Sequence, residues 1–321
     1  MPGWGPPSRE ASSFQPKPSL LDATSIAATR DAFDRSYLQG APAGWAESAE
    51  GTDEIEREIV EKYELCRRHV VPWAGGKVEL EGATMVEIGC GTGAKTVAFG
   101  QHVGGVIACD LSAPHLEAAR GRVQAAGLAN VELHNESASE LFDRLESTGS
   151  GQADVLLLFA VLEHMTLDER IETLERGFEI VRRGGLVVVA ETPNRLLPWD
   201  WHSSRLPFFN QLPDELAIRY FDRSPRADYV TSVRAGLERG EDEGLLALTR
   251  QGRGVSYHEF ELALGEPLAR VVVGDGYDPE MVAMNPVDHY ELVLKDFFRR
   301  EGLGVPVGFT RHWLDLLIRK P

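Results

Sequence analysis

Short apolar runs alternate with helix-like segments between residues 84 and 190. The apolar runs lie at 84–88, 106–109, 131–133, 154–159 and 186–190, and the helix-like segments lie at 93–102, 112–126 and 168–181. Strands that alternate with helices of this length form right-handed βαβ units, in which the strands are parallel. Two of the runs, VLLLFAV and LVVVA, are apolar throughout, as expected for strands covered on both faces. The alternation therefore predicts an α/β fold built on a mostly parallel sheet.

The segments on either side of this region differ from it in composition. The N-terminus is rich in Pro, Ser and Gly, which predicts a disordered tail, and a helical pattern that ends at Pro72 predicts a cap. The stretch after the fifth strand is dense in aromatic residues, Arg and Pro, which indicates an insertion. The expected organisation is a tail over 1–19, a helical cap over 20–79, a core over 80–194, an insertion over 195–270 and a C-terminal part over 271–321 that completes the sheet.

The formal net charge of −17 argues against a surface for nucleic acid or for an anionic membrane. Cys66, Cys90 and Cys109 lie far apart, and the sequence shows no disulfide framework and no metal-ligand spacing, so no metal is expected. It also contains no run of eighteen apolar residues and no signal pattern at its start. We therefore expect a cytoplasmic protein that acts on a small molecule, and the sequence leaves open whether it forms a homodimer.

The segment 85–100, MVEIGCGTGAKTVAFG, runs from an apolar strand through three glycines into a helix. Glycine at Gly89, Gly91 and Gly93 lets backbone N–H groups approach a ligand closely. The spacing Gly89-x-Gly91-x-x-Ala94 also satisfies the dinucleotide pattern G-x-G-x-x-A. The loop alone therefore indicates a nucleotide-like cofactor without deciding between two cofactor families.

Acidic and histidine side chains at the strand ends distinguish between these two families. Glu87, two residues before the loop, would repel a pyrophosphate and attract a cationic ligand. Asp110 ends the second strand, seventeen residues after Gly93, where a carboxylate can accept hydrogen bonds from both ribose hydroxyls. Glu163 and His164 follow the fourth strand. This order favours a cofactor that carries both a positive charge and a ribose.

With these motifs the sequence resembles the class I S-adenosylmethionine-dependent methyltransferases. VEIGCGTG is similar to their first motif, CDLS to their second, and DVLLLFAVLEHM and GGLVVVAETPN to the motifs on their fourth and fifth strands. The four motifs cover roughly residues 80–195. The resemblance implies a Rossmann-like, mostly parallel seven-stranded sheet with helices on both faces, and S-adenosylmethionine as the cofactor.

The resemblance also implies which residues contact the cofactor. The glycine loop would lie against its methionine part, Asp110 would bind the ribose, and Leu111 would pack on the adenine. Ser137 stands where the family often has an Asp that accepts from the adenine amino group; its hydroxyl can still accept, and the Ala138 amide can donate. The full set of expected cofactor residues is Glu87, Gly89, Gly91, Gly93, Asp110, Leu111, Ser137, Ala138, Phe159, Ala160 and His164.

The insertion is the expected site of the methyl acceptor. Its segment TPNRLLPWDWHSSRLPFF follows the fifth strand and so emerges at the carboxyl edge of the sheet, where ligands bind in such folds. Trp199, Trp201 and Arg205 are expected to contact the acceptor, and His202 is a candidate general base. A packed lid with the tryptophans in its core is the alternative.

The charge of the insertion favours an anionic acceptor. Nine Lys/Arg and ten Asp/Glu lie between Arg195 and Phe260, so this stretch carries a net charge of −1 within a strongly acidic chain. A nearly neutral segment that is rich in Arg indicates that an anionic group binds nearby. Ordinary surface arginines are the alternative.

Two further pairs of side chains are candidates for the acceptor site. Ser256 is expected to begin a helix, which places Tyr257 and His258 in its first turn. Tyr257 is a candidate for substrate contact, and His258 is either a second general base or a surface residue. Phe33 and Tyr37 lie four residues apart on one helical face, either as a packing pair or as part of a helical cover over the cofactor in which they contact the substrate.

These observations lead to a preferred function and to alternatives. We expect methyl transfer from S-adenosylmethionine to a small polar metabolite with a carboxylate. Oxygen or nitrogen is the expected acceptor atom, because such acceptors use a base and His202 or His258 could supply it. Methylation of a thioether amino acid such as methionine at sulfur is the alternative, since a thioether needs no base. An NAD(P)-dependent oxidoreductase and a non-catalytic module with a cofactor fold remain as alternatives of other classes.

Overall fold

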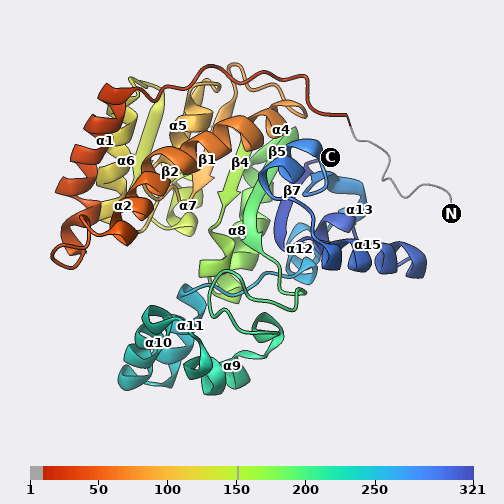
Figure 1. Ribbon diagram of the computed structural model, residues 1–321. Helices are drawn as coiled ribbons and strands as arrows, with labels where there is room; N and C mark the ends of the chain where they lie inside the picture. The colour runs from red at the N-terminus through yellow and green to blue at the C-terminus, as the bar shows by residue number, and fades with distance from the viewer. Residues whose placement is uncertain (1–9, 150–151) are drawn as a thin grey trace. The chain divides into compact units, whose positions relative to one another are not determined.

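The computed structural model describes residues 10–149 and 152–321. Its strands form one sheet in the order β3-β2-β1-β4-β5-β7-β6 (Figure 1). Their bounds are Thr84–Ile88 (β1), Gly105–Cys109 (β2), Val131–His134 (β3), Ala153–Phe159 (β4), Val181–Pro193 (β5), Val272–Asp275 (β6) and Trp313–Arg319 (β7). The pairs β1–β2 and β2–β3 are parallel, whereas β6 and β7 are antiparallel. The predicted α/β fold with a seven-stranded, mostly parallel sheet is confirmed.

Three helices follow the strands where the sequence predicts them, and a further helix, α7 (Ala138–Thr148), lies between β3 and β4 in the chain. The helices of the sheet region and of the C-terminal part are α5 (Ala94–Gly100), α6 (Ala113–Ala125), α7, α8 (Leu167–Ile180), α12 (Tyr257–Leu264), α13 (Leu268–Val271), α14 (Pro279–Met284) and α15 (His289–Glu301), with short helical turns η4 (Leu162–His164) and η7 (Val307–Thr310). Ser112 caps α6, because its hydroxyl accepts from the N–H of His115.

Two compact units make up the chain. The first consists of Met1–Leu157, Val181–Leu186 and Tyr277–Pro286, and the second of Leu158–Ile180, Val187–Gly276 and Val287–Pro321. The glycine loop lies in the first unit, and the whole segment between β5 and β6 lies in the second.

In the first unit, α1 (Ala23–Arg35) lies along α6 (Figure 1). Gly121 explains the close approach of the two helices, because a Cβ there would lie 2.2 Å from the Cβ of Ala32. Ser25 and Asp22 form a reciprocal cap at the start of α1. Ahead of this cap, the Phe14 ring lies edge-on against His102, so part of the expected tail makes specific contacts. Residues 1–9 of that tail lie outside the described residues.

The helix predicted to end at Pro72 begins at Ala49 and runs past this proline to Gly75. It continues through α2 (Ala49–Glu56), η2 (Arg57–Glu61), α3 (Lys62–Leu65), η3 (Cys66–Val70) and α4 (Val71–Gly75), and a short turn, η1 (Tyr37–Gly40), follows α1. The turn η3 is π-helical, and the N–H of Val71 donates to the carbonyl of Cys66. Proline lacks an N–H, and a wider turn directly before it accommodates its ring. The prediction that Pro72 closes the helix was wrong for this reason.

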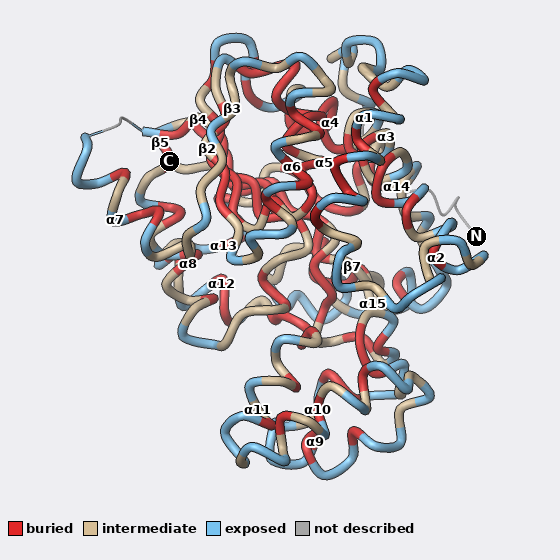
Figure 2. The backbone as a smooth tube through the Cα atoms, turned by 90° about the vertical axis from the view of Figure 1, so that its left-hand side faces the viewer, coloured by how far each residue is buried: buried red, intermediate tan, exposed pale blue. Residues whose placement is uncertain are grey.

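In the second unit, residues 206–250 form a helical arm. Its helices are α9 (Asp214–Tyr220), α10 (Ala227–Arg239) and α11 (Glu241–Arg250), with the turns η5 (Phe209–Gln211) and η6 (Phe221–Arg223). Buried and exposed positions alternate along α10 and α11 (Figure 2). The arm has its own buried cluster, which consists of Phe209, Ala217, Ile218, Phe221, Tyr229, Val233 and Leu248. The stretch LERGEDEG, which reads as a loop in the sequence, is the α10–α11 junction, because only Gly240 separates the two helices.

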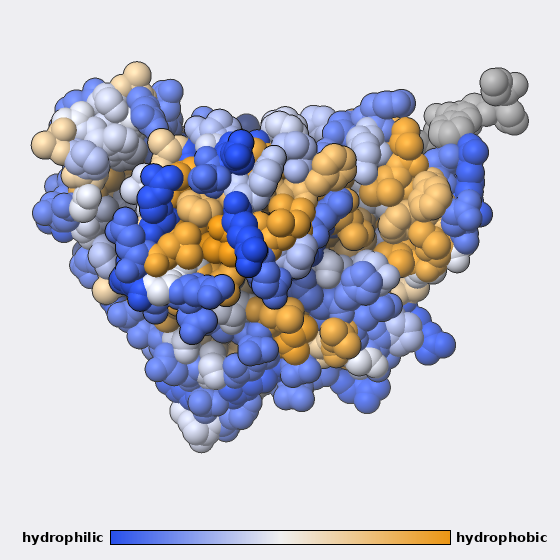
Figure 3. Space-filling view, turned by 90° about the horizontal axis from the view of Figure 1, so that it is seen from below, coloured by the Kyte–Doolittle hydropathy of each residue, from blue (hydrophilic) through white to orange (hydrophobic). Residues whose placement is uncertain are grey.

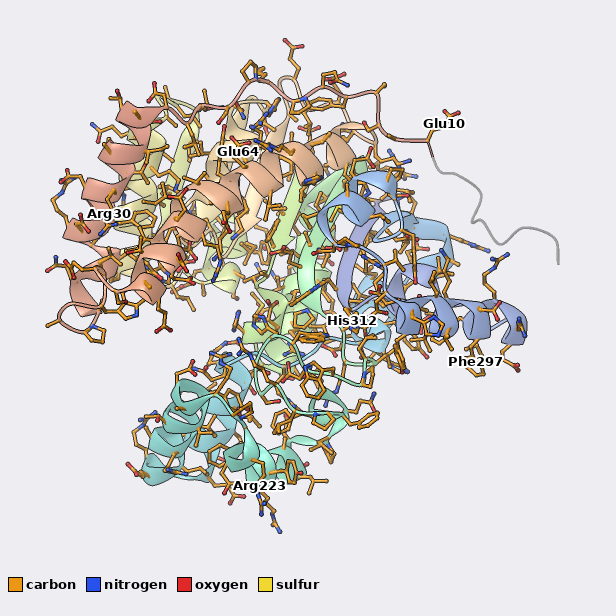
Figure 4. The ribbon with its side chains drawn as sticks, in the orientation of Figure 1. Glu10, Arg30, Glu64, Arg223, Phe297 and His312 are labelled. Carbon is orange, nitrogen blue, oxygen red and sulfur yellow. The ribbon has the colours of Figure 1, made fainter. Side chains whose placement is uncertain are left out.

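Several large apolar side chains remain on the surface. On the face seen from below they gather in patches between polar residues (Figure 3). On α15, Tyr290, Val293 and Phe297 are exposed at helical spacing, and Phe297 projects from the helix (Figure 4). Among the described residues, no helix combines the length and the apolar character needed to span a bilayer.

Candidate active site

The glycine loop of the first unit has the backbone conformation that its sequence requires. Gly89, Gly91 and Gly93 have φ angles of 72°, 53° and 80°, in the left-handed region that favours glycine. The N–H groups of Gly89 and Cys90 donate to the carbonyl of Cys109, at 2.9 and 3.0 Å. These two hydrogen bonds fix the loop to the end of β2, and the positive φ angles give its backbone a tight curvature.

The three glycines differ in the space around them. A Cβ at Gly93 would lie 3.0 Å from the Cβ of Ala119, so this position packs the loop against α6. A Cβ at Gly91 would meet no atom within 4 Å. Open space beside a left-handed glycine at the end of a parallel strand suits the close approach of a cofactor. Gly91 is therefore the loop position with room for a ligand.

Asp110 holds the loop and the start of α6 together. Its Oδ2 accepts from the N–H of Gly91 and its Oδ1 from the N–H of Ser112, both at 2.8 Å. Asn135 donates to the carbonyls of Asp110 and Leu111, which fixes the turn after β2. Leu111 itself is 69% exposed, so its side chain is available to pack on a flat ring. The carboxylate can accept further hydrogen bonds, as binding of ribose hydroxyls requires.

Glu87 is buried instead of facing solvent. Its side chain is 1% exposed, and its Oε2 accepts from the Thr96 hydroxyl at 2.7 Å. Burial raises the pKa of Glu87 to about 7, although the hydrogen bond from Thr96 and the charge of Lys95 act in the opposite direction. A positive charge that binds near this buried carboxyl group would stabilise its ionised form.

This pKa predicts how Glu87 affects stability. Because the folded pKa is raised above the usual value of 4.5, folding favours the protonated form, and stability falls as the pH rises through about 7. Glu87→Gln cannot ionise, so we expect the variant to gain stability over the parent between pH 5 and pH 8, by about 2–3 kcal/mol. Urea unfolding at both pH values measures this difference. Glu117→Gln on the surface of α6 is the control, and parallel profiles for all three proteins would contradict the prediction.

Ser137 and Ala138 begin α7 in the first unit. Ser137 is its N-cap, and its hydroxyl both donates to the Glu140 carboxylate and accepts from the Glu140 N–H, at 2.8 and 3.2 Å. Ala138 is the first residue of the helix, where backbone N–H groups have no partner within the helix itself. The hydroxyl of Ser137 is engaged in the cap, so a role toward adenine stays a prediction for this pair.

The two aromatic residues of α1 and η1 have different surroundings. Phe33 is fully buried, with Ile55 and Ile59 in its cluster and the Arg122 guanidinium over its ring at 5.3 Å. Its burial favours the packing role of the two alternatives, and its contact with substrate stays a prediction. Tyr37 is half-buried, and its ring lies 5.2 Å from that of His115. Only Tyr37 of this pair has a face open to a ligand.

In the second unit, the end of β4 leads into a cluster of ionisable side chains. Phe159 is 6% exposed, and Ala160 has a φ angle of 48°, with its N–H donating to the carbonyl of Ala190. The chain then turns through η4, which contains Glu163 and His164. A left-handed non-glycine residue at a strand end is a strained geometry that clusters at functional sites.

Glu163, His164 and His202 come together although they are distant in sequence. Each residue offers one ligand atom, which is a carboxylate oxygen for Glu163 and a ring nitrogen for each histidine. These three atoms lie within 4.8 Å of one another. The Nε2 atoms of His164 and His202 are 3.8 and 4.0 Å from Oε1 of Glu163. Glu163 has no exposed side-chain surface, whereas the two imidazole rings are partly exposed. The cluster is thus a buried carboxylate covered by two accessible histidines.

Burial favours the neutral form of both histidines of the cluster. Burial lowers the pKa of His202 to about 4, and the nearby His164 adds to this effect. Burial also lowers the pKa of His164, with Arg170 and Arg250 contributing in the same direction. A neutral imidazole can accept a proton or bind an electrophile, so both chemistries are open to this cluster.

A turn centred on Asp200 positions His202. The Asp200 carboxylate accepts from the N–H groups of residues 202–204 and from the hydroxyls of Ser203 and Ser204. Burial alone would raise the pKa of Asp200, but these hydrogen bonds lower it overall. Arg226 adds bonds to the carbonyls of His202 and Ser203, at 3.1 Å each. The turn is therefore rigid despite lying outside any helix or strand.

The same loop exposes its large side chains. Trp199 and Trp201 are 39% and 60% exposed, and their ring centroids are 5.7 Å apart. Arg205 is also exposed and has a φ angle of 53°. The packed-lid alternative expected these tryptophans in a core, whereas the structure leaves both on the surface. Acceptor contact by the three side chains stays a prediction that their exposure allows.

Many arginines of the insertion serve the fold. Arg253 is buried and donates to the carbonyls of Phe209 and Leu212 and to the carboxylate of Asp214. Arg250 pairs with Glu169 on α8 through two hydrogen bonds of 2.7 Å each. These contacts explain much of the basic content without an anionic ligand. Arg205 is therefore the clearest candidate from this stretch for binding a carboxylate.

The helix α12 begins as predicted. The Glu259 carboxylate accepts from the N–H and the hydroxyl of Ser256, at 3.0 and 3.1 Å. Tyr257 is half-buried, and the exposed ring of His258 lies 3.9 Å from its ring. His258 is not part of the cluster around Glu163, so its role as a base stays a prediction with no geometric support.

Three features of the second-unit site could not be found from the sequence, namely the proximity of His202 to Glu163, the role of Gly252 and the role of Trp313. Glu163 was paired with its neighbour His164, but His202 lies 39 residues further on, which no ligand-spacing rule covers. Gly252 makes room for the His202 ring, because a Cβ there would lie 2.4 Å from its Cδ2. Trp313 at the start of β7 meets the His202 ring edge-on. All three depend on chain reversals that bring separate segments together.

A comparison with protein families matches the segment that contains the glycine loop. Residues 85–185 match the profile of a family described as "Methyltransferase domain". A comparison with curated proteins finds no match.

Solved structures with a similar fold include three methyltransferases. An S-adenosylmethionine-dependent methyltransferase from Clostridium acetobutylicum is 15% identical, with a TM-score of 0.37, and the alignment covers 45% of this chain and 57% of that one. The magnesium protoporphyrin IX methyltransferase of Synechocystis is 18% identical, with 56% and 80% covered and a TM-score of 0.37. A phosphoethanolamine N-methyltransferase from Haemonchus contortus is 15% identical, with 53% and 32% covered and a TM-score of 0.37.

The strand order and the matched segment carry the assignment. The order β3-β2-β1-β4-β5-β7-β6 has an antiparallel pair only at its β7–β6 edge among the pairs described above. The match spans β1 to the start of β5 and includes the glycine loop and Asp110. Residues 85–185 therefore match the methyltransferase domain family, and the chain has a Rossmann-like α/β fold.

Proposed function

We propose that this protein transfers the methyl group of S-adenosylmethionine to a small polar metabolite that carries a carboxylate, at oxygen or nitrogen. One observation above all supports an acceptor of this kind. The segment 199–205 holds His202 rigidly while it leaves Trp199, Trp201 and Arg205 exposed beside it in sequence. Aromatic faces, a guanidinium and an imidazole are the groups that orient such a metabolite.

The reaction is an in-line displacement. The acceptor atom forms a bond to the methyl carbon while the sulfonium–carbon bond breaks, and that electron pair returns to sulfur to give S-adenosylhomocysteine. The acceptor loses a proton, for which His202 and His258 are the proposed bases. The glycine loop and Asp110 would hold the donor. Most of the catalysis then lies in aligning the reactants.

Methylation at sulfur is the second proposal for the same site. A thioether needs no base, and the exposed rings of Trp199 and Trp201 would stabilise the sulfonium that forms. An oxidoreductase and a non-catalytic module are disfavoured by the match of residues 85–185 to the methyltransferase domain.

Methyl transfer from deuterated-methyl S-adenosylmethionine tests the proposal. The parent protein is incubated with hydroxy acids, amino acids, amines and thioethers, and mass spectrometry detects deuterated product. We expect one carboxylate-bearing class to be labelled at oxygen or nitrogen. Label on sulfur would favour the second proposal, and cofactor binding without label on any acceptor class would favour a non-catalytic module.

Arg205 variants then test the carboxylate contact. We expect Arg205→Leu to raise the acceptor KM and to leave cofactor affinity unchanged, and Arg205→Lys to restore part of the loss, because an ammonium cannot bind in a bidentate manner. Arg223→Leu is the matched control, since Arg223 is also exposed and projects from η6 (Figure 4). An equal KM for Arg205→Leu and the parent would show that the carboxylate binds elsewhere.

A further inference from the structure

We propose that Glu163, His164 and His202 form a binding site for a divalent transition-metal ion. Their three ligand atoms lie within 4.8 Å of one another. Metal–ligand bonds of about 2.0–2.2 Å would bring such atoms to about 3–3.6 Å apart, so each has to move by less than about 1 Å. Two imidazoles and one carboxylate are the ligand set of zinc sites and of sites for Mn²⁺, Fe²⁺ or Co²⁺.

The separations within the cluster favour an ion over a direct hydrogen bond. The distances of 3.8 and 4.0 Å from Glu163 Oε1 to the two Nε2 atoms exceed the range of a hydrogen bond. They suit two nitrogens and an oxygen that converge on a point between them. Glu163 is fully buried, and the side chains of His164 and His202 are 41% and 25% exposed, which leaves a path for an ion from solvent.

Each ligand is held by a contact at its far side. The Nδ1 of His164 lies 2.9 Å from the carbonyl of Arg250; when Nδ1–H donates to that carbonyl, the lone pair is at Nε2, which faces Glu163. Metal-binding histidines commonly donate their second ring N–H to a carbonyl in this way. The backbone carbonyl of Glu163 accepts from the N–H of Arg253 at 2.9 Å and from the guanidinium of Arg170 at 3.2 Å.

His202 is held by its turn and by a glycine. Asp200 and Arg226 fix the backbone of this residue from two sides. Gly252 has a φ angle of 108°, and a Cβ at this position would lie 2.8 Å from Nε2 of His202. The absence of a side chain at Gly252 therefore allows the ring to reach its place beside Glu163.

Such an ion would define the acceptor further, and this step rests on the proposed function. Three protein ligands leave coordination positions open for other oxygen donors. A divalent ion there would bind an acceptor hydroxyl and lower its pKa, so that the proton passes to solvent and His202 serves as a ligand in place of a base. The acceptor class would then be a hydroxylated metabolite with a second oxygen donor, such as a hydroxy acid or a diol.

Metal binding to the full chain tests the site directly. The protein is prepared without a polyhistidine tag, stripped with a chelator and titrated with Zn²⁺ and Co²⁺ by calorimetry, and the visible absorption of Co²⁺ reports nitrogen ligation. We expect one ion per chain. Glu163→Gln and His202→Ala should each weaken binding by about 100-fold or more, and Gly252→Ala, which keeps all three ligands, by about 10–100-fold.

His289→Ala is the matched control, because His289 is an exposed histidine at the start of α15. Unfolding curves confirm that each variant is folded before titration. No stoichiometric binding to the parent, or equal binding by the parent, Glu163→Gln and His202→Ala, would overturn the proposal.

The methyl-transfer assay separates this inference from the proposed function. Stoichiometric metal binding without methyl transfer to any acceptor would leave the metal site standing and remove the methyltransferase proposal. Methyl transfer that persists at full rate in the chelator-stripped protein would remove the metal's role toward the acceptor. Dependence of transfer on added Co²⁺ or Zn²⁺ would support both.

Discussion

Arg170→Met is expected to lower the free energy of unfolding by about 3–5 kcal/mol, because it leaves a buried carboxylate without its cation. The guanidinium of Arg170 lies 3.2 Å from the Glu259 carboxylate, and both residues are buried. It also donates to the carbonyls of Met165, Arg253 and Glu163, at 3.0–3.2 Å. One side chain therefore holds α8, the start of α12 and the turn η4 together.

Urea unfolding of the parent and the variant measures this loss. Arg176→Met on the same helix is the control, since its partner Glu172 is partly exposed and such pairs contribute less than about 1 kcal/mol. Glu259→Gln added to Arg170→Met should restore part of the stability, because it removes the uncompensated charge. Similar losses for Arg170→Met and Arg176→Met would contradict the assigned role.

Gly91→Val is expected to abolish cofactor binding while leaving the protein folded. A side chain at Gly91 has open space in the protein alone, so its steric effect falls on whatever ligand approaches the loop. We expect the affinity for S-adenosylhomocysteine to fall by at least about 100-fold, or about 3 kcal/mol. Calorimetry measures the affinity, and urea unfolding measures the effect on the fold.

Gly127→Val is the matched control for this variant. Gly127 has a φ angle of 68° and open space around its Cα, so valine is equally strained there without a ligand in its path. The two variants should lose similar stability, of about 1–3 kcal/mol, but only Gly91→Val should lose the cofactor. Retention of affinity by Gly91→Val would show that the cofactor lies away from this glycine.

Most of the sheet could be predicted from the sequence because its signals are local. The runs at 84–88 and 154–159 are apolar and flanked by helical patterns, and the structure places β1 and β4 within one residue of these bounds. Left-handed glycines at Gly89, Gly91 and Gly93 are likewise required by a tight turn whose residues are adjacent. Patterns of this kind determine the backbone conformation from adjacent residues alone.

The cluster around Glu163 could not be predicted, because its geometry is not local. His202 reaches Glu163 only because a turn at Asp200 and a bare backbone at Gly252 combine, and neither leaves a periodic pattern. The surroundings of Phe33 could not be predicted either, for a related reason. An aromatic residue on a helical face looks the same in sequence whether that face meets solvent or another helix, and here it meets buried Ile55 and Ile59.

The arm over residues 206–250 supplies the apolar side chains for its own interior, from Phe209 to Leu248. A segment built in this way tolerates exchange of its outward-facing residues with little loss of stability, since surface substitutions away from special contacts usually change it by less than about 0.5 kcal/mol. Natural substitutions can therefore change the exposed side chains of α9, α10 and α11 while the buried cluster of the arm stays the same. The arm is the part of this protein best suited to mutational diversification in the laboratory, as a library confined to its exposed positions.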